Sequence, residues 1–148
     1  MTNNRISLGS WLIASARTKI LPFHLMRSSK KLASLRFDGV EPRGFPPDPS
    51  PAQFSSKTQR DKLRRKVVSH GLAFSGLAAN LWWFSIVSQV DQSAWMDAFE
   101  SNLNLCCDLG IDAIRFDTAS PPHIFEKDKV DPQRGWERVV NTFRAAAQ

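Results

Sequence analysis

The most constraining feature of the sequence is a short apolar segment, residues 111–116, that lies between a helical pattern and a polar turn. Before it, apolar residues recur at helical spacing over residues 91–109, and Gly110 stands where a left-handed helix end is usual. After it come Asp117, Thr118 and two prolines, which cannot extend a strand ladder. This order of helix, glycine, strand and polar residues predicts one unit of an α/β fold. In such folds the polar residues just past each strand usually form the ligand surface.

The same unit recurs along the whole chain. Strands are expected at residues 6–13, 37–41, 72–79 and 111–116. The helices that follow them are expected at residues 22–35, 55–70, 91–109 and 131–147. Strict alternation predicts parallel strands in the order one to four, joined by right-handed crossovers. No linker divides the chain, so we expect one domain over residues 1–148, with residues 1–4 disordered.

The helix ends carry recognisable local signals. Ser55 or Ser56 is expected to cap the second helix, and Asp131 followed by Pro132 is expected to begin the last one. The last helix also carries an apolar stripe that is expected to be buried: Trp136, Val139, Val140, Phe143 and Ala147.

The composition allows one globular domain with a hydrophobic core, since 42% of the 148 residues are hydrophobic. The net charge of +6 would suit a nucleic-acid partner, but the basic excess lies in residues 1–37, which contain no acidic residue. The remaining chain is close to balanced, so we expect no nucleic-acid partner. The basic run at residues 60–66 is interpreted as the solvated face of a helix.

No apolar run approaches the ~20 residues that are needed to cross a bilayer, so no membrane association is expected. The expected location is the cytoplasm. The acid-free N-terminus, rich in serine and arginine, leaves a removable mitochondrial targeting peptide as the alternative.

The two cysteines, Cys106 and Cys107, are neighbours on an expected helix and point about 100° apart. Such neighbours rarely form a disulfide, and no metal-ligand spacing is present. The interpretation is a pair of buried structural thiols in a reducing compartment.

Five groups of short motifs follow one another along nearly the whole chain. They are Leu8-Gly-Ser-Trp11; Phe37-Asp-Gly-Val-Glu41 with Arg43-Gly-Phe45; His70-Gly-Leu72 with Ser75-Gly76; Asp108-Leu-Gly-Ile111 with Ile114-Arg-Phe-Asp117; and Trp136-Glu-Arg-Val-Val140. In this order and spacing the chain resembles the sugar phosphate isomerase/epimerase superfamily, whose fold is the xylose isomerase-like TIM barrel.

The resemblance implies a particular fold class and cofactor. The family's barrel has eight βα units, and this chain resembles the first four, so the expected fold is a partial (half) TIM barrel with four βα units and parallel strands. The family's metal ligands are carried by the later strands and match no residue here. No catalytic residue, metal ligand or cofactor is therefore assigned to this chain, and a divalent metal is expected only for a full-length barrel.

The resemblance also implies a function. The complete family isomerises or epimerises a sugar or sugar phosphate by metal-assisted proton transfer next to a carbonyl. This chain is then a truncated relative that binds a sugar or sugar phosphate and is inactive alone. The alternative is a non-catalytic half-barrel that pairs, through its open strand edges, with another copy of itself or with a partner chain.

Six residues near the expected strand ends are candidates for substrate binding: Trp11, Glu41, Arg43, Asn80, Trp82 and Asp117. Glu41 could contact a sugar hydroxyl, or instead form a salt bridge with Arg43 or Arg115. Arg43 could hold a phosphate or carboxylate through its planar fork, or act as a loop arginine that caps the barrel.

The remaining candidates rest on their positions past strands three and four. Trp82 could pack against a sugar face or belong to the core of its loop, and Asn80 lies just before it. Asp117 ends an apolar strand, where a buried carboxylate is costly unless it has partners. A cap or a salt bridge to Arg115 is the structural alternative for Asp117.

Overall fold

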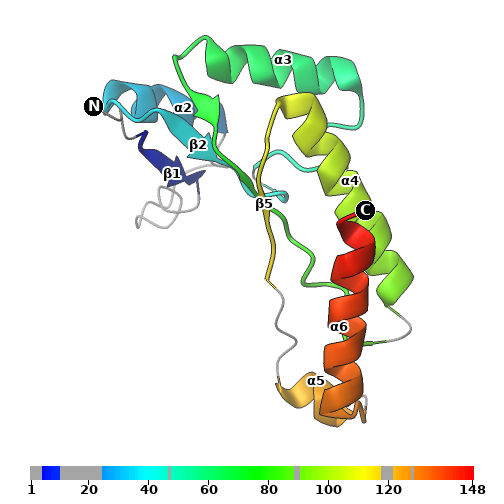
Figure 1. Ribbon diagram of the computed structural model, residues 1–148. Helices are drawn as coiled ribbons and strands as arrows, with labels where there is room; N and C mark the ends of the chain where they lie inside the picture. The colour runs from blue at the N-terminus through cyan, green and yellow to red at the C-terminus, as the bar shows by residue number, and fades with distance from the viewer. Residues whose placement is uncertain (1–4, 11–24, 47, 89–90, 118–121, 128) are drawn as a thin grey trace. The chain divides into compact units, whose positions relative to one another are not determined.

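The computed structural model describes residues 5–10, 25–46, 48–88, 91–117, 122–127 and 129–148 (Figure 1). The strands are β1 (Ser7–Gly9), β2 (Gly39–Glu41), β3 (Ala73–Phe74), β4 (Leu77–Ala78) and β5 (Ile114–Arg115). The helices are α2 (Leu25–Ser34), α3 (Lys57–Val68), α4 (Gln92–Leu109), α5 (Pro122–Lys127) and α6 (Pro132–Ala146).

The contacts between residues divide the chain into two compact units, and each unit has its own core. The first comprises Met1–Ala79 and Asn102–Arg115, and the second comprises Asn80–Ser101 and Phe116–Gln148. One domain over residues 1–148 therefore stays a prediction. Residues 1–4, which are expected to be disordered, lie outside the described residues.

The first unit is built on parallel strands. β1, β2 and β3 pair in that order, with Leu8 opposite Val40, and β4 pairs with β5. The two ladders are linked, because the amide of Ala78 donates to the carbonyl of Pro42 at 2.9 Å. The four expected strands therefore lie parallel in the order one to four. The α/β fold class is confirmed, with parallel strands as in part of a TIM barrel.

The strands are shorter than the sequence pattern predicts. The third expected strand is interrupted at Ser75 and Gly76, which lie between β3 and β4, and the fourth is reduced to two residues. The part of the first expected strand from Trp11 onward lies outside the described residues. Ladder ends depend on the partner strand, which a local apolar pattern does not contain.

The helices begin and end where the local signals place them. Ser56 caps α3 in a capping box, in which its side chain accepts from the amide of Gln59 and the Gln59 side chain accepts from the Ser56 amide. Asp131 caps α6 and is followed by proline at the first turn. Gly71 and Gly110 adopt positive φ angles of 76° and 70°, so both act as left-handed helix ends.

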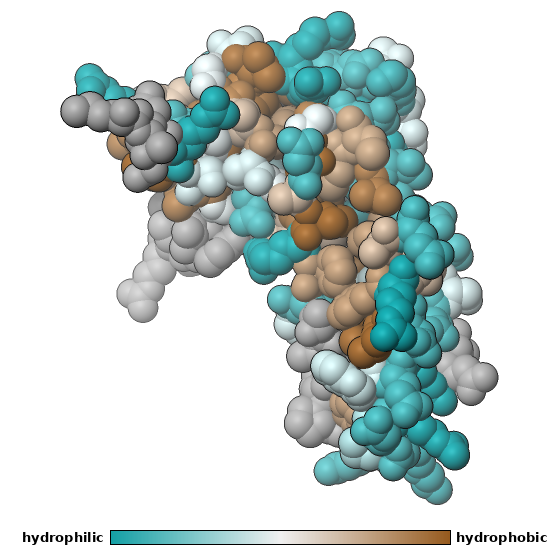
Figure 2. Space-filling model, in the orientation of Figure 1, coloured by the Kyte–Doolittle hydropathy of each residue, from teal (hydrophilic) through white to brown (hydrophobic). Residues whose placement is uncertain are grey.

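The core of the first unit lies between its helices and its sheet. α2 packs on β2, α3 packs on β3, and the two helices also contact each other. The most deeply buried apolar side chains of this unit are Leu32, Val40, Val67, Leu77, Leu105 and Leu109. The outer surface of α3 is mainly hydrophilic, as Figure 2 shows, because its lysines and arginines other than Arg60 are exposed.

An aromatic cluster forms the core of the second unit. Trp95 stacks on Phe99 with ring centroids 5.4 Å apart, and Phe116 meets Trp95 edge-on at 5.5 Å. Phe143, on α6, lies 5.4 Å from Phe116. The strand-end residue Phe116 is therefore part of this core, together with α4 and α6.

The buried stripe expected on the last helix is only partly correct. Trp136 is 64% exposed, whereas Gly135 and Thr142 are buried. A Cβ at Gly135 would come within 2.8 Å of the Phe125 ring, so the small residue allows α5, which the sequence did not predict, to pack closely. The sequence pattern relies on large apolar residues, so it did not indicate that the small residue Gly135 lies at the contact with α5.

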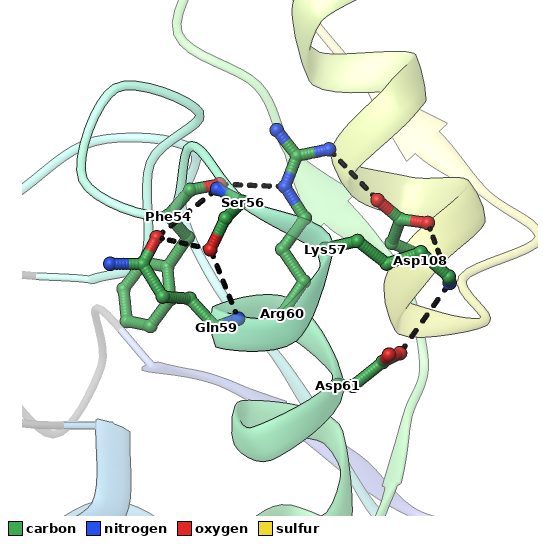
Figure 3. A network of polar contacts seen from close by, with 7 residues as sticks. All are labelled: Phe54, Ser56, Lys57, Gln59, Arg60, Asp61 and Asp108. Atoms are coloured by element: carbon green, nitrogen blue, oxygen red, sulfur yellow. Dashed lines mark hydrogen bonds and ion pairs between the residues drawn. The ribbon is translucent and has the colours of Figure 1, made fainter.

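A polar network links the start of α3 to the end of α4 within the first unit (Figure 3). Asp108 accepts from Lys57 Nζ at 3.2 Å and from Arg60 Nη1 at 3.0 Å. Arg60 also donates from Nε to the carbonyl of Phe54 at 2.6 Å, and Lys57 lies 3.5 Å from Asp61. These bonds connect two helices that are distant in the sequence.

The network shifts the pKa of its members in the direction that favours charge. The hydrogen bonds from Lys57 and then Arg60 lower the pKa of Asp108 below its ordinary value of 3.8. The hydrogen bond to Asp108 raises the pKa of Lys57 above 10.5. Because the folded-state pKa of Asp108 is lowered, its contribution to stability is present above pH 3.8 and is lost as the pH falls through the lowered value.

We predict that Asp108→Asn lowers the melting temperature at pH 7 and lowers it less at pH 2, because a fall in pH through the lowered pKa of Asp108 moves the wild-type carboxyl toward its protonated form. Thermal unfolding followed by circular dichroism at both pH values measures the difference. Asp61→Asn is the matched control and should lower the melting temperature less, since among the described residues Asp61 forms an ion pair with Lys57 only, whereas Asp108 pairs with both Lys57 and Arg60. An equal loss of stability at both pH values would contradict the assignment.

Candidate functional site

Glu41, the first candidate on β2, is the last residue of that strand. Arg115, at the end of β5, donates from Nε to Glu41 Oε1 at 3.3 Å. The Glu41 side chain is 25% exposed and that of Arg115 is 54% exposed. Ion pairs with this much water access contribute roughly 0–1 kcal/mol. Of the partners weighed for Glu41, the structure shows Arg115.

The backbone around this pair is closely packed. A Cβ at Gly76 would lie 3.7 Å from Glu41 Oε1, so the break between β3 and β4 lies beside the carboxylate. A Cβ at Gly44 would come within 2.5 Å of the side-chain oxygen of Asn102. Glycine at position 44 therefore lets the chain pass close to the middle of α4, at Asn102, just after the candidate residue Arg43.

Arg43, the second candidate of this unit, is held by a buried carboxylate. Its Nε donates to Asp48 Oδ2 at 3.0 Å, and its backbone amide donates to the same oxygen at 3.2 Å. The guanidinium carbon lies 4.9 Å from the centroid of the Phe45 ring. The Asp48 side chain is 0% exposed and that of Arg43 is 18% exposed. The Arg43 guanidinium is therefore fixed in position and partly accessible to solvent.

Ser10 completes the group around Asp48. It is fully buried, and its Oγ donates to Asp48 Oδ2. One carboxylate oxygen thus accepts three hydrogen bonds, two of them from Arg43. Charge-assisted bonds of this kind are shorter and stronger than neutral ones.

Three candidates belong to the second unit. The side-chain oxygen of Asn80 accepts from the backbone amide of Trp82 at 3.3 Å, so Asn80 shapes the turn. The indoles of Trp82 and Trp83 are 69% and 81% exposed, which shows that Trp82 is not the core of its loop. Asp117 is exposed as well, so the argument that its burial would be costly does not apply.

The six candidates fall into separate groups. Glu41 and Arg43 lie close together in the first unit, at the end of β2. Asn80, Trp82 and Asp117 belong to the second unit, and Trp11 lies outside the described residues. A substrate site shared by all six stays a prediction.

Sequence reasoning missed the two side chains that hold Arg43. Asp48 lies in the proline-rich segment Pro46-Pro47-Asp48-Pro49, five residues after Arg43. A carboxylate in such a stiff loop is a sequence signal that could have indicated a salt bridge to this arginine. Ser10 offered no comparable signal, because it lies 38 residues from Asp48 in the sequence.

The described residues do not form a metal centre. Among them no group of three histidine, cysteine or carboxylate side chains lies close enough to hold a metal ion. The described residues therefore do not fit the divalent metal that the resemblance implies for a complete barrel, and no chemical step is assigned to a metal here. In the same part of the chain, no helix is long and apolar enough to span a membrane.

The two cysteines differ in burial. Cys106 is buried, and burial together with the neighbouring Cys107 raises the pKa of its thiol to about 11. Cys107 is exposed, so the expectation that both thiols are buried is wrong for this residue. Two adjacent helical residues face different directions, and only one of these faces the core.

The sequence matches no known protein family and no curated protein. A solved structure of D-psicose 3-epimerase, described in the presence of D-fructose, is similar in fold, with a TM-score of 0.63 at 15% sequence identity. The alignment covers 96% of this chain and 47% of the epimerase, so the chain spans about half the length of that enzyme. At this identity the similarity shows the fold alone. It supports the partial TIM-barrel fold class that the sequence predicts.

We predict that a thiol reagent at pH 8 modifies Cys107 quickly and leaves Cys106 unmodified in the folded chain. The raised pKa and burial of Cys106 remove both its thiolate and its access to the reagent. Mass spectrometry of the labelled protein identifies the site. Cys107→Ser should abolish fast labelling, and fast labelling of this variant would contradict the buried position of Cys106.

Proposed function

We propose that this chain supplies the substrate-binding strands of a sugar isomerase/epimerase-like barrel. The observation that carries the proposal is the fold similarity, in which almost the whole chain aligns with about half of a sugar epimerase. The remainder of such a barrel would come from further residues of a longer protein or from a second chain. The proposed ligand is a sugar or a sugar phosphate.

The chemistry of the β2 end supports sugar binding. Glu41 is a carboxylate that accepts hydrogen bonds from hydroxyl groups, and its pairing with the exposed Arg115 is weak enough for a hydroxyl to compete. Arg43 adds fixed N–H donors a short distance along the chain. In parallel α/β folds, ligands bind at the carboxyl ends of the strands, where both residues lie.

Catalysis is proposed for the completed barrel and not for this chain alone. The reaction expected from the resemblance is proton transfer next to a carbonyl, and the described residues contain no clustered metal ligands. The role proposed for the present residues is to bind and orient the sugar. The chain by itself should therefore show no epimerase or isomerase activity.

We predict that D-fructose and D-fructose 6-phosphate each produce saturable shifts of the Glu41 and Arg43 backbone amides in NMR titrations. Glu41→Gln should weaken binding about tenfold, since a hydrogen bond to a charged group is worth roughly 1.5–3 kcal/mol. Glu100→Gln, which changes an exposed carboxylate on α4, should leave binding unchanged. Amides of Glu41 and Arg43 that respond to neither sugar would contradict the proposal.

The rival proposal is a non-catalytic half-barrel that pairs with itself or with a partner chain. It starts from the same coverage of about half a barrel, since an incomplete barrel leaves backbone groups of its outer strands without strand partners. Sedimentation velocity separates the two proposals. The interaction module should sediment as a dimer or larger without any sugar, whereas a concentration-independent monomer that binds sugar supports the first proposal.

A further inference from the structure

The guanidinium of Arg43 is fixed in two independent ways. Its face lies over Phe45, with the central carbon 4.9 Å from the ring centroid, and this contact sets the plane of the group. Its Nε edge donates to Asp48 at 3.0 Å, and this bond sets the rotation within that plane. A flexible side chain is thereby held in one orientation before any ligand arrives.

The opposite edge of the guanidinium remains available. Arginine has five N–H donors, of which one lies on Nε and four lie on the two Nη atoms. Within the described residues no acceptor meets either Nη atom of Arg43, and neither atom is among the polar atoms that are sealed from solvent without a partner. The side chain keeps 18% of its surface exposed, so this edge reaches solvent.

The hydrogen bonds to the Asp48 side chain all meet one of its two carboxylate oxygens. Oδ2 accepts all three hydrogen bonds, while Oδ1 is sealed and accepts none within the described residues. A sealed carboxylate oxygen without a donor is costly, whereas a neutral amide could accept the bonds from Ser10 and from the backbone at a smaller desolvation cost. The contact that offsets this cost is the ion pair with Arg43.

We propose that Asp48 is a positioning residue that holds Arg43 as a receptor for an oxyanion, the phosphate or carboxylate group of a ligand. The two Nη atoms form the planar fork that binds such groups with two parallel hydrogen bonds. A lysine at this position could not present that fork. The proposal rests on the proposed function for the sugar part of the ligand, but the anion site itself does not require it.

The test is an NMR titration of the full 148-residue chain with inorganic phosphate, followed through the Nε–H signal of Arg43. Saturable movement of this signal is expected, and Arg43→Lys should weaken phosphate binding about tenfold because the bidentate contact is lost. Arg144→Lys removes the same kind of fork from an exposed position on α6 and should change nothing. Phosphate binding that survives Arg43→Lys unchanged overturns the proposal.

The positioning role of Asp48 has its own readout. In the wild-type chain the Nε–H of Arg43 should exchange with water more slowly than that of Arg144, since Asp48 holds it. Asp48→Asn should speed this exchange and weaken phosphate binding about tenfold. Equal exchange rates for the two arginines in the wild-type chain overturn the role, whether or not Asp48→Asn folds.

Parallel titrations with gluconate and with D-fructose separate the possible outcomes. Gluconate that moves the Arg43 signal supports a site for carboxylates as well as phosphates, and a response to phosphate alone supports a phosphate site. Binding of inorganic phosphate without any response to D-fructose or D-fructose 6-phosphate at Glu41 supports the anion site and contradicts the proposed sugar function. D-fructose binding without any response of Arg43 to an oxyanion supports the proposed sugar function and contradicts the anion site.

Discussion

The first unit depends on one segment, residues 73–79, that is paired on both of its sides. On one side the amide of Ala78 donates to Pro42, and on the other the amide of Leu77 donates to Ala113, each at 2.9 Å. Parallel strands cannot be joined by tight turns, so each pairing requires a crossover through a helix. This segment therefore determines which helices connect the strands and brings the ends of β2 and β5 to the same edge. The ion pair between those two strand ends follows from this pairing.

The sequence predicted those parts of the fold that local chemistry determines. The sequence predicts a cap at Ser55 or Ser56 and another at Asp131, because a cap needs partners only within three residues of itself, and the structure shows Ser56 and Asp131 as caps. The expected strands are longer than the observed ones, because a strand ends where its hydrogen-bonded partner strand turns away, as at Ser75. Trp136 was assigned to a buried stripe because a large apolar residue is assumed to be buried, whereas the contact in fact uses the small residue Gly135.

The candidate site was predictable to the same extent. Glu41 and Arg43 were found because polar residues directly after a strand are visible in the sequence alone. The partners of these two residues were harder to predict. Arg115 is one of the two alternatives that the sequence offers for Glu41, and the sequence gives no prediction of Asp48 as the partner of Arg43. Contacts across 74 and 38 residues, as for Arg115 with Glu41 and Ser10 with Asp48, are set by strand order and loop path. No local pattern contains that information.

The two arginine–carboxylate pairs, Arg43 with Asp48 and Arg115 with Glu41, differ in burial. This difference determines which pair can separate and which pair stays together. Asp48 is sealed, so removing its bond to Arg43 would leave a buried charge without compensation, and the pair keeps its geometry. Glu41 and Arg115 are exposed enough that separating them costs roughly 0–1 kcal/mol. In the proposed sugar site, a ligand hydroxyl would therefore replace Arg115 at Glu41, whereas a ligand would gain nothing by replacing Asp48 at Arg43. In the two proposals, Arg43 would therefore bind a ligand through its Nη edge, and Glu41 would bind a ligand by exchanging Arg115 for a hydroxyl group.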